Sequence, residues 1–377
     1  MPVTLYADRN IYHLKDWLPG DVNLITFEPS NGLPDLSDAD ALIVRTVSKI
    51  NAETLKTIPK SLRFVGTASA GTDHIDIDYL EDHGVRFVSA AGCNARAVAE
   101  YIGTSLIIWA DQTGIKLHDR TIGIVGVGHV GSELVDLLDE MQVPYVTYDP
   151  PREERESDFT SAALDEVLDC EILTFHVPLT ETGDYATHHW LDAEKLSGHS
   201  YELVINASRG GVIDEEALID AINSGHVKNS VIDVWENEPA FNPEMLPMSI
   251  LATPHIAGYS VQAKDNATRM MMKPLADTFQ LKWENNISSS DSPLTLSDSN
   301  DASLSSLLES INPILSYDNE LRSVAGLPDD ERAAAFRKMR TDRPFREEYR
   351  MFTASEELCK KHPYLVALGI HRKGSPP

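Results

Sequence analysis

The chain has 377 residues, 42% of them hydrophobic, a length that exceeds one ordinary core and predicts two or three domains. Its 59 acidic and 32 basic residues give a net charge of −27, which argues against nucleic acid and anionic membrane as partners. No apolar run reaches the roughly 18 residues of a membrane helix, and the opening MPVTLYADRN shows no secretory signal. The cysteines are far apart and show no metal-ligand spacing, so we expect a cytoplasmic protein without a metal site.

Short runs rich in β-branched residues recur through the first quarter of the chain. Polar stretches compatible with helices separate them, and this alternation predicts a parallel α/β sheet. The runs are VTLYA, NLITFE, ALIVRT, RFVGTAS and VRFVSAA. Residues 95–112 then read as one long helix that leads out of this unit.

A second α/β series follows, and its predicted strands are RTIGIVGVG, VPYVTYD, CEILTFHV, YELVINAS, NSVIDV and ILATP. A helical run begins near residue 263, and the Ser-, Asp- and Asn-rich stretch 285–306 reads as a linker with one short strand. Beyond it we expect helices and the strand-like EEYRMFT. This region is too small to bury a large core alone, so we expect it to pack against the main body or a second subunit. The predicted domains are a substrate-binding domain (1–95 and 257–286), a nucleotide-binding domain (96–256) and a C-terminal domain (287–377).

The segment TIGIVGVGHVGSELVDLLDEMQVPYVTYD carries a GxGxxG pattern at Gly126, Gly128 and Gly131. A strand precedes the glycines, an amphipathic helix follows, and a second strand ends at Asp149, which together form the βαβ context of dinucleotide binding. The glycines allow a tight turn and close approach of the pyrophosphate to the helix N-terminus. Asp149 is placed to accept hydrogen bonds from the adenosine ribose, which favours NAD over NADP, although Arg152 and Arg155 nearby weaken that preference.

Three side chains suited to dehydrogenation follow predicted strands of the second series. Hydride removal from an alcohol carbon needs a base for the hydroxyl proton and a cation for a neighbouring carboxylate. Arg209, Glu238 and His255 each follow a strand, at the edge where α/β proteins bind ligands. Taken singly they could be a surface charge, a solvated turn residue and a structural histidine. Their order behind a dinucleotide motif favours catalysis.

The chain resembles the D-isomer-specific 2-hydroxyacid dehydrogenase family over residues 1 to about 286. The matching segments are SAGTDHID (69–76), GVGHVG (126–131), HVPLT (176–180), NASRGGVIDEEAL (206–218), DVWENEP (233–239) and TPHIAGYS (253–260). The resemblance implies an α/β fold of two doubly wound parallel-sheet domains, flavodoxin-like for the substrate and Rossmann for NAD. It further implies that His255 is the acid/base, that Glu238 orients it, and that Arg209 holds the substrate carboxylate.

The same resemblance implies contacts with the cofactor and the substrate. The cofactor contacts are Gly126, Gly128, His129, Val130, Gly131, Asp149, His176, Val177, Pro178, Ala207, Ser208, Asp233 and Gly258. The substrate contacts are Thr46, Thr67, Gly71 and Tyr259.

Three features are similar to one subgroup of the family, whose substrate is a small phosphorylated 2-hydroxy acid. They are AGCNARAVAEY (91–101), the short Glu238-to-His255 loop with YDPP (148–151), and a C-terminal region that the subgroup uses to form a homodimer. Residues 336–350 are a basic island in an acidic chain. We hypothesise that arginines of this island lie near the substrate, while a solvated helix face is an equally good interpretation.

Two alternatives stay open. One is another dehydrogenase of the family, either a hydroxypyruvate or glyoxylate reductase or a phosphoglycerate dehydrogenase. The other is a non-catalytic NAD-sensing binding protein on the same fold, because a Rossmann domain by itself does not define a reaction.

Overall fold

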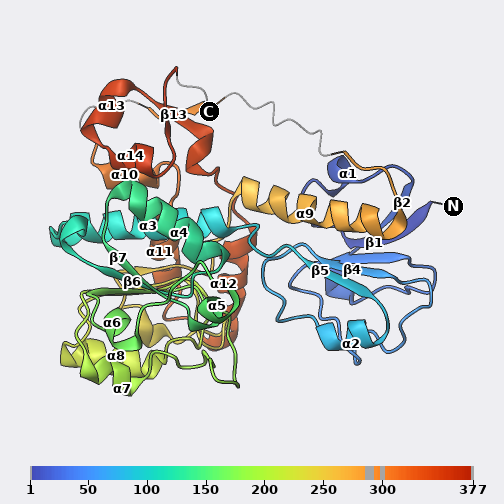
Figure 1. Ribbon diagram of the computed structural model, residues 1–377, viewed down its shortest axis with the longest axis horizontal. Coiled ribbons are helices and arrows are strands. Elements are labelled where there is room, and N and C mark those ends of the chain that lie inside the picture. Colours follow the sequence, from blue (N-terminus) through green and yellow to red (C-terminus); the bar gives the residue numbers. More distant parts are fainter. Residues whose placement is uncertain (1, 285–292, 298–301, 375–377) are drawn as a thin grey trace. The chain divides into compact units, whose positions relative to one another are not determined.

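The computed structural model describes residues 2–284, 293–297 and 302–374. The chain forms two compact units, Met1–Asn94 with Ser260–Ser292, and Ala95–Tyr259 with Pro293–Pro377. Each unit is built on a parallel sheet with helices packed against it (Figure 1). Within the described ranges, no helix is long and apolar enough to span a membrane.

The first unit contains a five-stranded parallel sheet of order β2-β1-β3-β4-β5, which is the flavodoxin-like order. Both faces are covered, one by apolar residues of α9 such as Met271 and Leu275, the other by loop and α2 residues such as Leu36 and Leu80. The elements are β1 (Val3–Asp8), α1 (Leu14–Trp17), β2 (Val22–Phe27), η1 (Pro29–Asn31), β3 (Ala41–Val44), β4 (Phe64–Thr67), α2 (Ile77–Asp82), β5 (Arg86–Ser89) and α9 (Val261–Phe279).

The second unit contains a six-stranded parallel sheet of order β11-β10-β9-β8-β6-β7. Its strands are β6 (Ile122–Val125), β7 (Tyr145–Tyr148), β8 (Ile172–Phe175), β9 (Leu203–Asn206), β10 (Ser230–Ile232) and β11 (Leu251–Ala252). Its helices up to residue 259 are α3 (Ala95–Thr113), η2 (Leu117–Asp119), α4 (His129–Met141), α5 (Pro150–Arg155), α6 (Leu164–Leu168), α7 (Ala193–Gly198), α8 (Glu215–Ser224) and η3 (Pro243–Met245).

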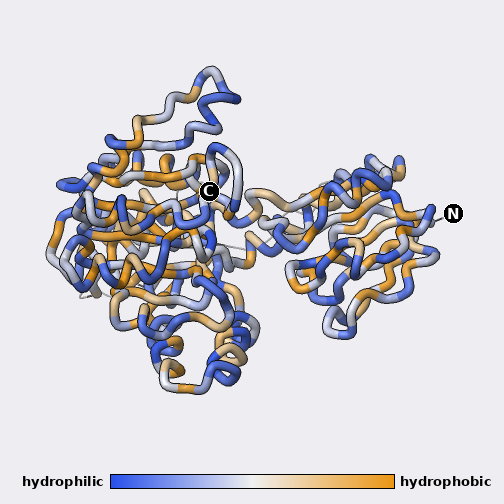
Figure 2. Tube along the Cα trace, turned by 90° about the horizontal axis from the view of Figure 1, so that it is seen from below, coloured by the Kyte–Doolittle hydropathy of each residue, from blue (hydrophilic) through white to orange (hydrophobic). Residues whose placement is uncertain are grey.

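Sequence pattern explains why these strands are central. IGIV, ILTF and LVIN are buried throughout, as expected for strands with helices on both faces. The apolar sides of α3 and α4 share one core with one face of the sheet, and those of α7 and α8 share the other. Figure 2 shows hydrophobic residues concentrated inside each unit and hydrophilic residues more often at its surface.

The C-terminal segment adds a three-stranded parallel sheet, β12-β13-β14, and several helices to the second unit. Its Leu308, Ile314, Tyr349 and Leu365 belong to the same apolar core as α3 and α4. The segment thus shares a core with α3 and α4, as expected for a region too small to bury a large core alone. The predicted bounds of the C-terminal domain stay a prediction. The elements are β12 (Leu294–Thr295), α10 (Leu304–Glu309), α11 (Ile314–Ser323), α12 (Asp329–Thr341), η4 (Tyr349–Met351), β13 (Phe352–Ala354), α13 (Glu356–Lys361), α14 (Tyr364–Ala367) and β14 (His371–Arg372).

The α/β fold class is confirmed, with the predicted strand series found in both sheets. The predicted strand EEYRMFT is shorter in the structure, because Tyr349–Met351 form a 3-10 turn before β13. Most of the predicted linker lies outside the described residues, except for β12 and the start of α10.

Candidate active site

The candidate residues of the second unit gather at one edge of its sheet. All six strands are parallel, so their carboxyl ends meet there, and the strand order reverses between β6 and β8. Ligands of open α/β sheets bind at such a reversal. The residues that follow the strands at this edge are Gly126, Gly128, His129, Val130, Gly131, Asp149, His176, Val177, Pro178, Ala207, Ser208, Arg209, Asp233, Glu238, His255 and Gly258.

The glycine loop after β6 has the form that a dinucleotide requires. Gly126 has φ +89°, and a Cβ there would lie 2.8 Å from the His176 carbonyl oxygen. A Cβ at Gly131 would lie 2.2 Å from the Gly126 carbonyl oxygen, so this glycine lets α4 approach the strand. A Cβ at Gly128 would have no atom within 4 Å, and Gly128 directly precedes the N-terminal N–H groups of α4. The loop therefore fits a pyrophosphate against the helix N-terminus.

The residues after β7 favour NAD. Asp149 caps α5 by accepting from the Arg152 N–H at 2.9 Å, and its Oδ2 accepts from the Val127 N–H at 2.8 Å. The Arg152 guanidinium donates to the Val127 carbonyl at 2.7 Å and to Ser132 Oγ at 3.2 Å, and it pairs with Glu156 at 2.8 Å. Because these contacts occupy Arg152, it is poorly placed to bind a 2′-phosphate.

His176 presents a buried polar atom beside the glycine loop. Its Nε2 lies 3.1 Å from Thr174 Oγ1, while its Nδ1 is buried without a hydrogen-bond partner among the described residues. Burial lowers the pKa of His176 to about 3, so the ring is neutral. An orphaned polar atom at this edge fits the polar part of a bound cofactor.

Glu238 and His255 come from two separate loops and meet directly. His255 Nδ1 lies 2.5 Å from Glu238 Oε1. Between the loops lies the buried Trp235, whose Nε1 donates to the Thr253 carbonyl at 2.9 Å and whose backbone N–H donates to Glu238 Oε2 at 3.4 Å. His255 has a positive φ of 55°, a conformation in which this loop turns its side chain toward Glu238.

Asp233 fastens the loop that carries His255, which sequence reasoning did not foresee. Its Oδ1 accepts from Thr253 Oγ1 at 2.6 Å and from the Ile256 N–H at 2.8 Å, and its Oδ2 accepts from the Ala257 N–H at 2.9 Å. Burial raises the pKa of Asp233, and the His255 charge and these hydrogen bonds oppose that effect. The predicted contact of Asp233 with the cofactor stays a prediction.

Arg209 follows β9 and is carried close to the Glu238 loop by a glycine. Its Nη1 donates to the Ser208 carbonyl at 2.9 Å, and its own carbonyl accepts from Asn206 Nδ2 at 3.0 Å. A Cβ at Gly210 would lie 1.9 Å from the Trp235 carbonyl oxygen. Only glycine permits this approach, which sets the Arg209 loop against the chain just before Glu238.

The four predicted substrate contacts lie in both units. In the first unit, Thr46 follows β3, Thr67 ends β4 and Gly71 follows β4, so all three lie at the carboxyl edge of that sheet. Thr67 is buried, and its Oγ1 lies 2.9 Å from His74 Nε2. In the second unit, the Tyr259 ring meets Phe345 edge-on at 5.9 Å. Their roles stay predictions.

The arginines of the basic island have different surroundings. Arg343 pairs with Glu320, and Arg346 pairs at 2.6 Å with the fully buried Glu100. Arg346 is therefore neither solvated nor available to a substrate. Arg340 Nη1 lies 4.0 Å from Glu238 Oε1. The sequence did not show which arginine of the basic island would lie near Glu238.

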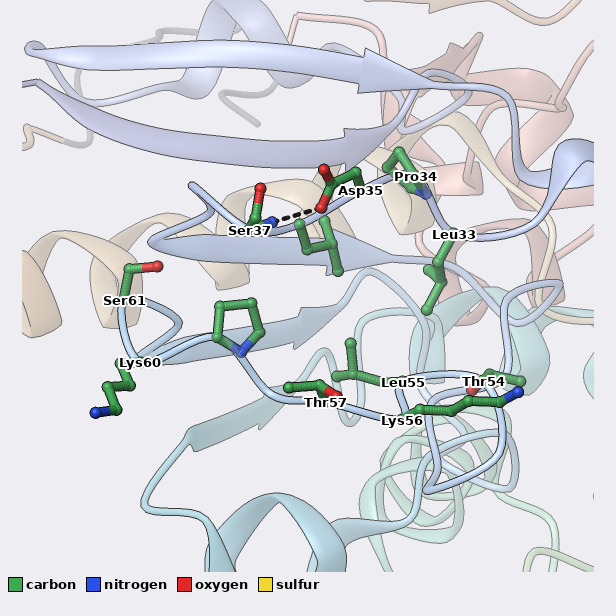
Figure 3. A pocket seen from close by; sticks show the side chains of 12 residues that line it. Leu33, Pro34, Asp35, Ser37, Thr54, Leu55, Lys56, Thr57, Lys60 and Ser61 are labelled. Atoms are coloured by element: carbon green, nitrogen blue, oxygen red, sulfur yellow. Dashed lines mark hydrogen bonds between the residues drawn. The ribbon is translucent and has the colours of Figure 1, made fainter.

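A cavity of about 680 Å³ lies in the first unit, apart from the candidate site residues (Figure 3). It is lined by two loops, residues 33–37 and 54–61, that precede β3 and β4. None of the candidate site residues lines this cavity. The described residues contain no group of three or more His, Cys, Asp or Glu side chains able to hold a metal.

Glu215 next to the site should make stability depend on pH. Burial raises the pKa of Glu215 from 4.5 to about 7, against the hydrogen bond that its Oε1 accepts from the Glu236 N–H. Its contribution to folding is fully present below pH 4.5 and is lost as pH rises through about 7. Glu215→Gln should therefore stabilise the protein at pH 8 by roughly 3 kcal/mol, with a gain that vanishes at pH 4.5.

Urea unfolding at several pH values measures this effect. Glu216→Gln, on the exposed side of α8, removes the same charge and is the matched control. An equal gain in both variants, or a gain that does not depend on pH, would contradict the assignment to Glu215.

Comparison with known proteins agrees with this geometry. Residues 103–257 match the model of the D-isomer specific 2-hydroxyacid dehydrogenase NAD binding domain. The fold is similar to that of the D-lactate dehydrogenase from Aquifex aeolicus complexed with NAD and lactic acid (TM-score 0.58, 24% identity, 74% of this chain and 95% of that chain). It is also similar to the NADPH-dependent glyoxylate/hydroxypyruvate reductase from Sinorhizobium meliloti (TM-score 0.60, 22% identity, 74% and 94%). The sheet order, the glycine loop and the Glu–His pair thus define a D-2-hydroxyacid dehydrogenase with an NAD-binding domain.

More similar relatives narrow this class. The erythronate-4-phosphate dehydrogenase of Pseudoalteromonas atlantica is 36% identical over 94% of this chain and 95% of its own. That of Bacteroides thetaiotaomicron is 39% identical over 84% and 88%, and that of Escherichia coli O9:H4 is 44% identical over 71% of both. The chain belongs to the erythronate-4-phosphate dehydrogenase family. The predicted family, its subgroup and NAD as the cofactor are confirmed.

Proposed function

We propose that the chain oxidises 4-phospho-D-erythronate at C2, with NAD as the oxidant, to (R)-3-hydroxy-2-oxo-4-phosphooxybutanoate. This reaction is a step of pyridoxal phosphate (vitamin B6) biosynthesis. The name shared by the relatives indicates the substrate. The observation that carries the chemistry is the contact of 2.5 Å between His255 Nδ1 and Glu238 Oε1.

In this proposal bound NAD would supply the acceptor for the hydride that leaves C2. The Glu238 carboxylate accepts from His255 Nδ1–H, which leaves the lone pair of Nε2 to take the proton of the C2 hydroxyl. Arg209 binds the substrate carboxylate, a task suited to its planar pair of donors. Thr46, Thr67, Gly71 and Tyr259 complete the substrate contacts.

The cofactor would be held by residues at the carboxyl edge of the six-stranded sheet. Gly126, Gly128 and Gly131 would receive the pyrophosphate, and Asp149 the adenosine ribose. The remaining proposed contacts are His129, Val130, His176, Val177, Pro178, Ala207, Ser208, Asp233 and Gly258.

Single-turnover absorbance of NADH tests the substrate. Purified protein with NAD should give a burst with 4-phospho-D-erythronate and none with D-3-phosphoglycerate or D-glycerate. Turnover of either other acid without a burst from the phosphoerythronate would replace the proposed substrate by that acid. The same assay with 2-oxoglutarate added would show whether bound NADH is reoxidised in place.

We further propose that the chain works in the cytoplasm as a homodimer formed through its C-terminal segment. The extra segment beyond residue 286 supports a dimer, because it is the part that generic members of the family lack. The free cysteines Cys93, Cys170 and Cys359 suit a reducing compartment. Light scattering on the full chain should give twice the chain mass of 41.7 kDa.

A further inference from the structure

The C-terminal segment brings a cation to the catalytic pair. Arg340, near the end of α12, has its Nη1 4.0 Å from Glu238 Oε1. The same carboxylate oxygen lies 2.5 Å from His255 Nδ1. The three side chains therefore form a row, with the carboxylate between the guanidinium and the imidazole. All three belong to the second unit.

Packing of α12 fixes where Arg340 lies. Phe336 is fully buried, with its ring centroid 5.6 Å from that of Phe241, and Met339 is also buried. The Arg340 guanidinium lies 6.0 Å from the Phe336 ring and 5.8 Å from the Tyr259 ring. Its side chain is 27% exposed, and its buried Nε has no hydrogen-bond partner among the described residues. The aromatic rings thus hold the guanidinium beside Glu238.

Other arginines of this segment are bound to different groups. Arg343 donates to Ser316 Oγ at 3.0 Å and pairs with Glu320. Arg332 donates to the Leu327 carbonyl at 2.9 Å and pairs with Asp329. Arg340, in contrast, has Glu238 as its ion-pair partner among the described carboxylates.

We propose that Arg340 is a positioning residue that holds the Glu238 carboxylate as an anion facing His255 Nδ1, an inference that rests on the proposed function. The state of Glu238 decides whether His255 can act as a base. An ionised Glu238 accepts from Nδ1–H and leaves the Nε2 lone pair for the substrate. A protonated Glu238 would donate to Nδ1, so that Nε2 would carry the ring proton and the base would be lost.

The charges around Glu238 explain why a cation is needed. Burial raises the pKa of Glu238. Glu215 on α8 lies close enough that the two carboxyl groups repel each other when both are ionised. Glu236 on the same loop pairs with His189, and Asp233 after β10 accepts hydrogen bonds from Thr253 Oγ1 and from the Ile256 and Ala257 N–H groups. The hydrogen bond and charge of His255, followed by the charge of Arg340, hold the pKa of Glu238 below its ordinary value. An opposite charge at this range lowers a carboxyl pKa by roughly 1–3 units.

The first test is the pH dependence of kcat for Arg340→Gln in the full-length enzyme. The acidic limb should move up by about one pH unit, which makes kcat roughly tenfold lower on that limb and leaves it near wild type at high pH. Arg340→Lys keeps the charge and should restore most of the limb. Arg337→Gln, exposed on the same helix, is the matched control and should leave the profile unchanged.

A second measurement works without any substrate. In protein labelled with ¹³C at the glutamate carboxyl carbons, Glu238→Gln assigns the Glu238 signal. The titration midpoint of that signal should rise in Arg340→Gln and stay unchanged in Arg337→Gln. If wild-type enzyme does not turn over the phosphoerythronate, the proposed function fails, yet this titration still decides the role of Arg340.

Two results would overturn the inference. One is an acidic limb and a Glu238 midpoint that are both unchanged in Arg340→Gln. The other is a higher KM for the phosphorylated substrate with an unchanged pH profile, which would assign the guanidinium to the substrate phosphate instead.

Discussion

The His255→Gln variant should lose between roughly 10²-fold and 10⁴-fold in kcat, the usual contribution of a general base. Glutamine is close in size to histidine but cannot take a proton from the C2 hydroxyl. The contacts of the glycine loop after β6 do not involve His255, so the dissociation constant of NADH should change little. Single-turnover absorbance and NADH fluorescence measure the two quantities.

Two further variants sharpen this test. Glu238→Gln keeps a hydrogen-bonding group at 2.5 Å from the imidazole but removes the charge, so its loss in kcat should be substantial and smaller than that of His255→Gln. His118→Gln alters a histidine that is 57% exposed on η2 and should behave as wild type. A kcat of His255→Gln within a few-fold of wild type would contradict its role as base. If biological activity also survived, it would favour the NAD-sensing alternative.

Glu100→Ala should lower the free energy of unfolding by about 3–5 kcal/mol, the usual cost of leaving a buried ion without its partner. Glu100 lies on α3 and is fully buried. Its Oε2 pairs with Arg346 at 2.6 Å, and its Oε1 accepts from Arg96 at 3.2 Å and from the Tyr349 N–H at 3.0 Å. Arg346 is only 7% exposed, so the variant would leave its charge buried without this carboxylate.

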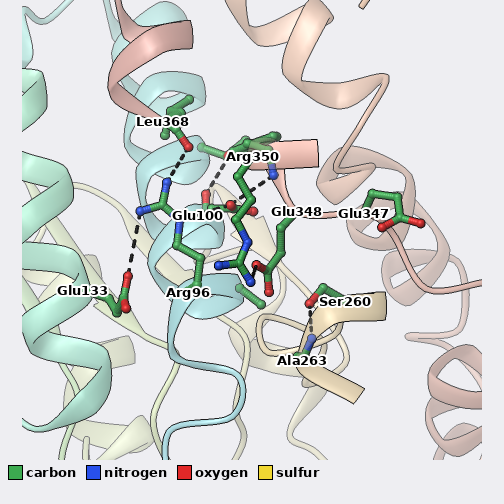
Figure 4. A network of polar contacts seen from close by, with 12 residues as sticks. Arg96, Glu100, Glu133, Ser260, Ala263, Glu347, Glu348, Arg350 and Leu368 are labelled. Atoms are coloured by element: carbon green, nitrogen blue, oxygen red, sulfur yellow. Dashed lines mark hydrogen bonds and ion pairs between the residues drawn. The ribbon is translucent and has the colours of Figure 1, made fainter. Parts of the chain in front are cut away.

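Part of the network around Glu100 is shown in Figure 4, which draws the ion pairs of Arg96 with Glu133 and of Glu348 with Arg350. Arg96 also donates to the Leu368 carbonyl at 2.6 Å. These contacts join α3 and α4 to the C-terminal segment. Loss of Glu100 should therefore loosen that segment before the rest of the second unit.

Urea unfolding measures the global loss, and hydrogen exchange at the Tyr349 amide measures the local one. Lys360→Ala breaks an exposed i,i+4 pair with Glu356 in the same unit and should cost less than about 1 kcal/mol. Glu100→Leu combined with Arg346→Met should recover most of the stability, since well-packed apolar residues often replace a buried pair without loss. A cost for Glu100→Ala no larger than that of Lys360→Ala would show that the pair contributes little.

Local patterns were sufficient for the architecture. Short apolar runs separated by polar stretches predicted the strands of both sheets, because a buried parallel strand is apolar along its whole length. GVGHVG predicted the turn after β6, because only glycine tolerates φ +89° at Gly126 and the 2.2 Å approach at Gly131. The sequence did not show which core the C-terminal segment joins, because a run of residues does not show where its apolar side chains will pack.

The candidate catalytic residues could be chosen from the sequence because each follows a strand, and parallel strands bring their carboxyl ends together. The contact between Glu238 and His255 could be seen only in the structure. It depends on hydrogen bonds from Trp235 and to Asp233, which hold the two loops together. Nothing in the spacing of acidic residues showed that Asp233 would hold the His255 loop or that Glu215 would be buried.

The sequence by itself determined the fold class, the cofactor, the family and the identity of the residues that follow each strand, since these depend on period and short motifs. Tertiary structure alone decided which charges meet. Glu100 and Arg346 are 246 positions apart, and Arg340 is one of several arginines in a basic segment. Ion pairs leave no periodic pattern in the sequence. The partner of each arginine is therefore determined only when α3, α12 and the Glu238 loop pack into one core.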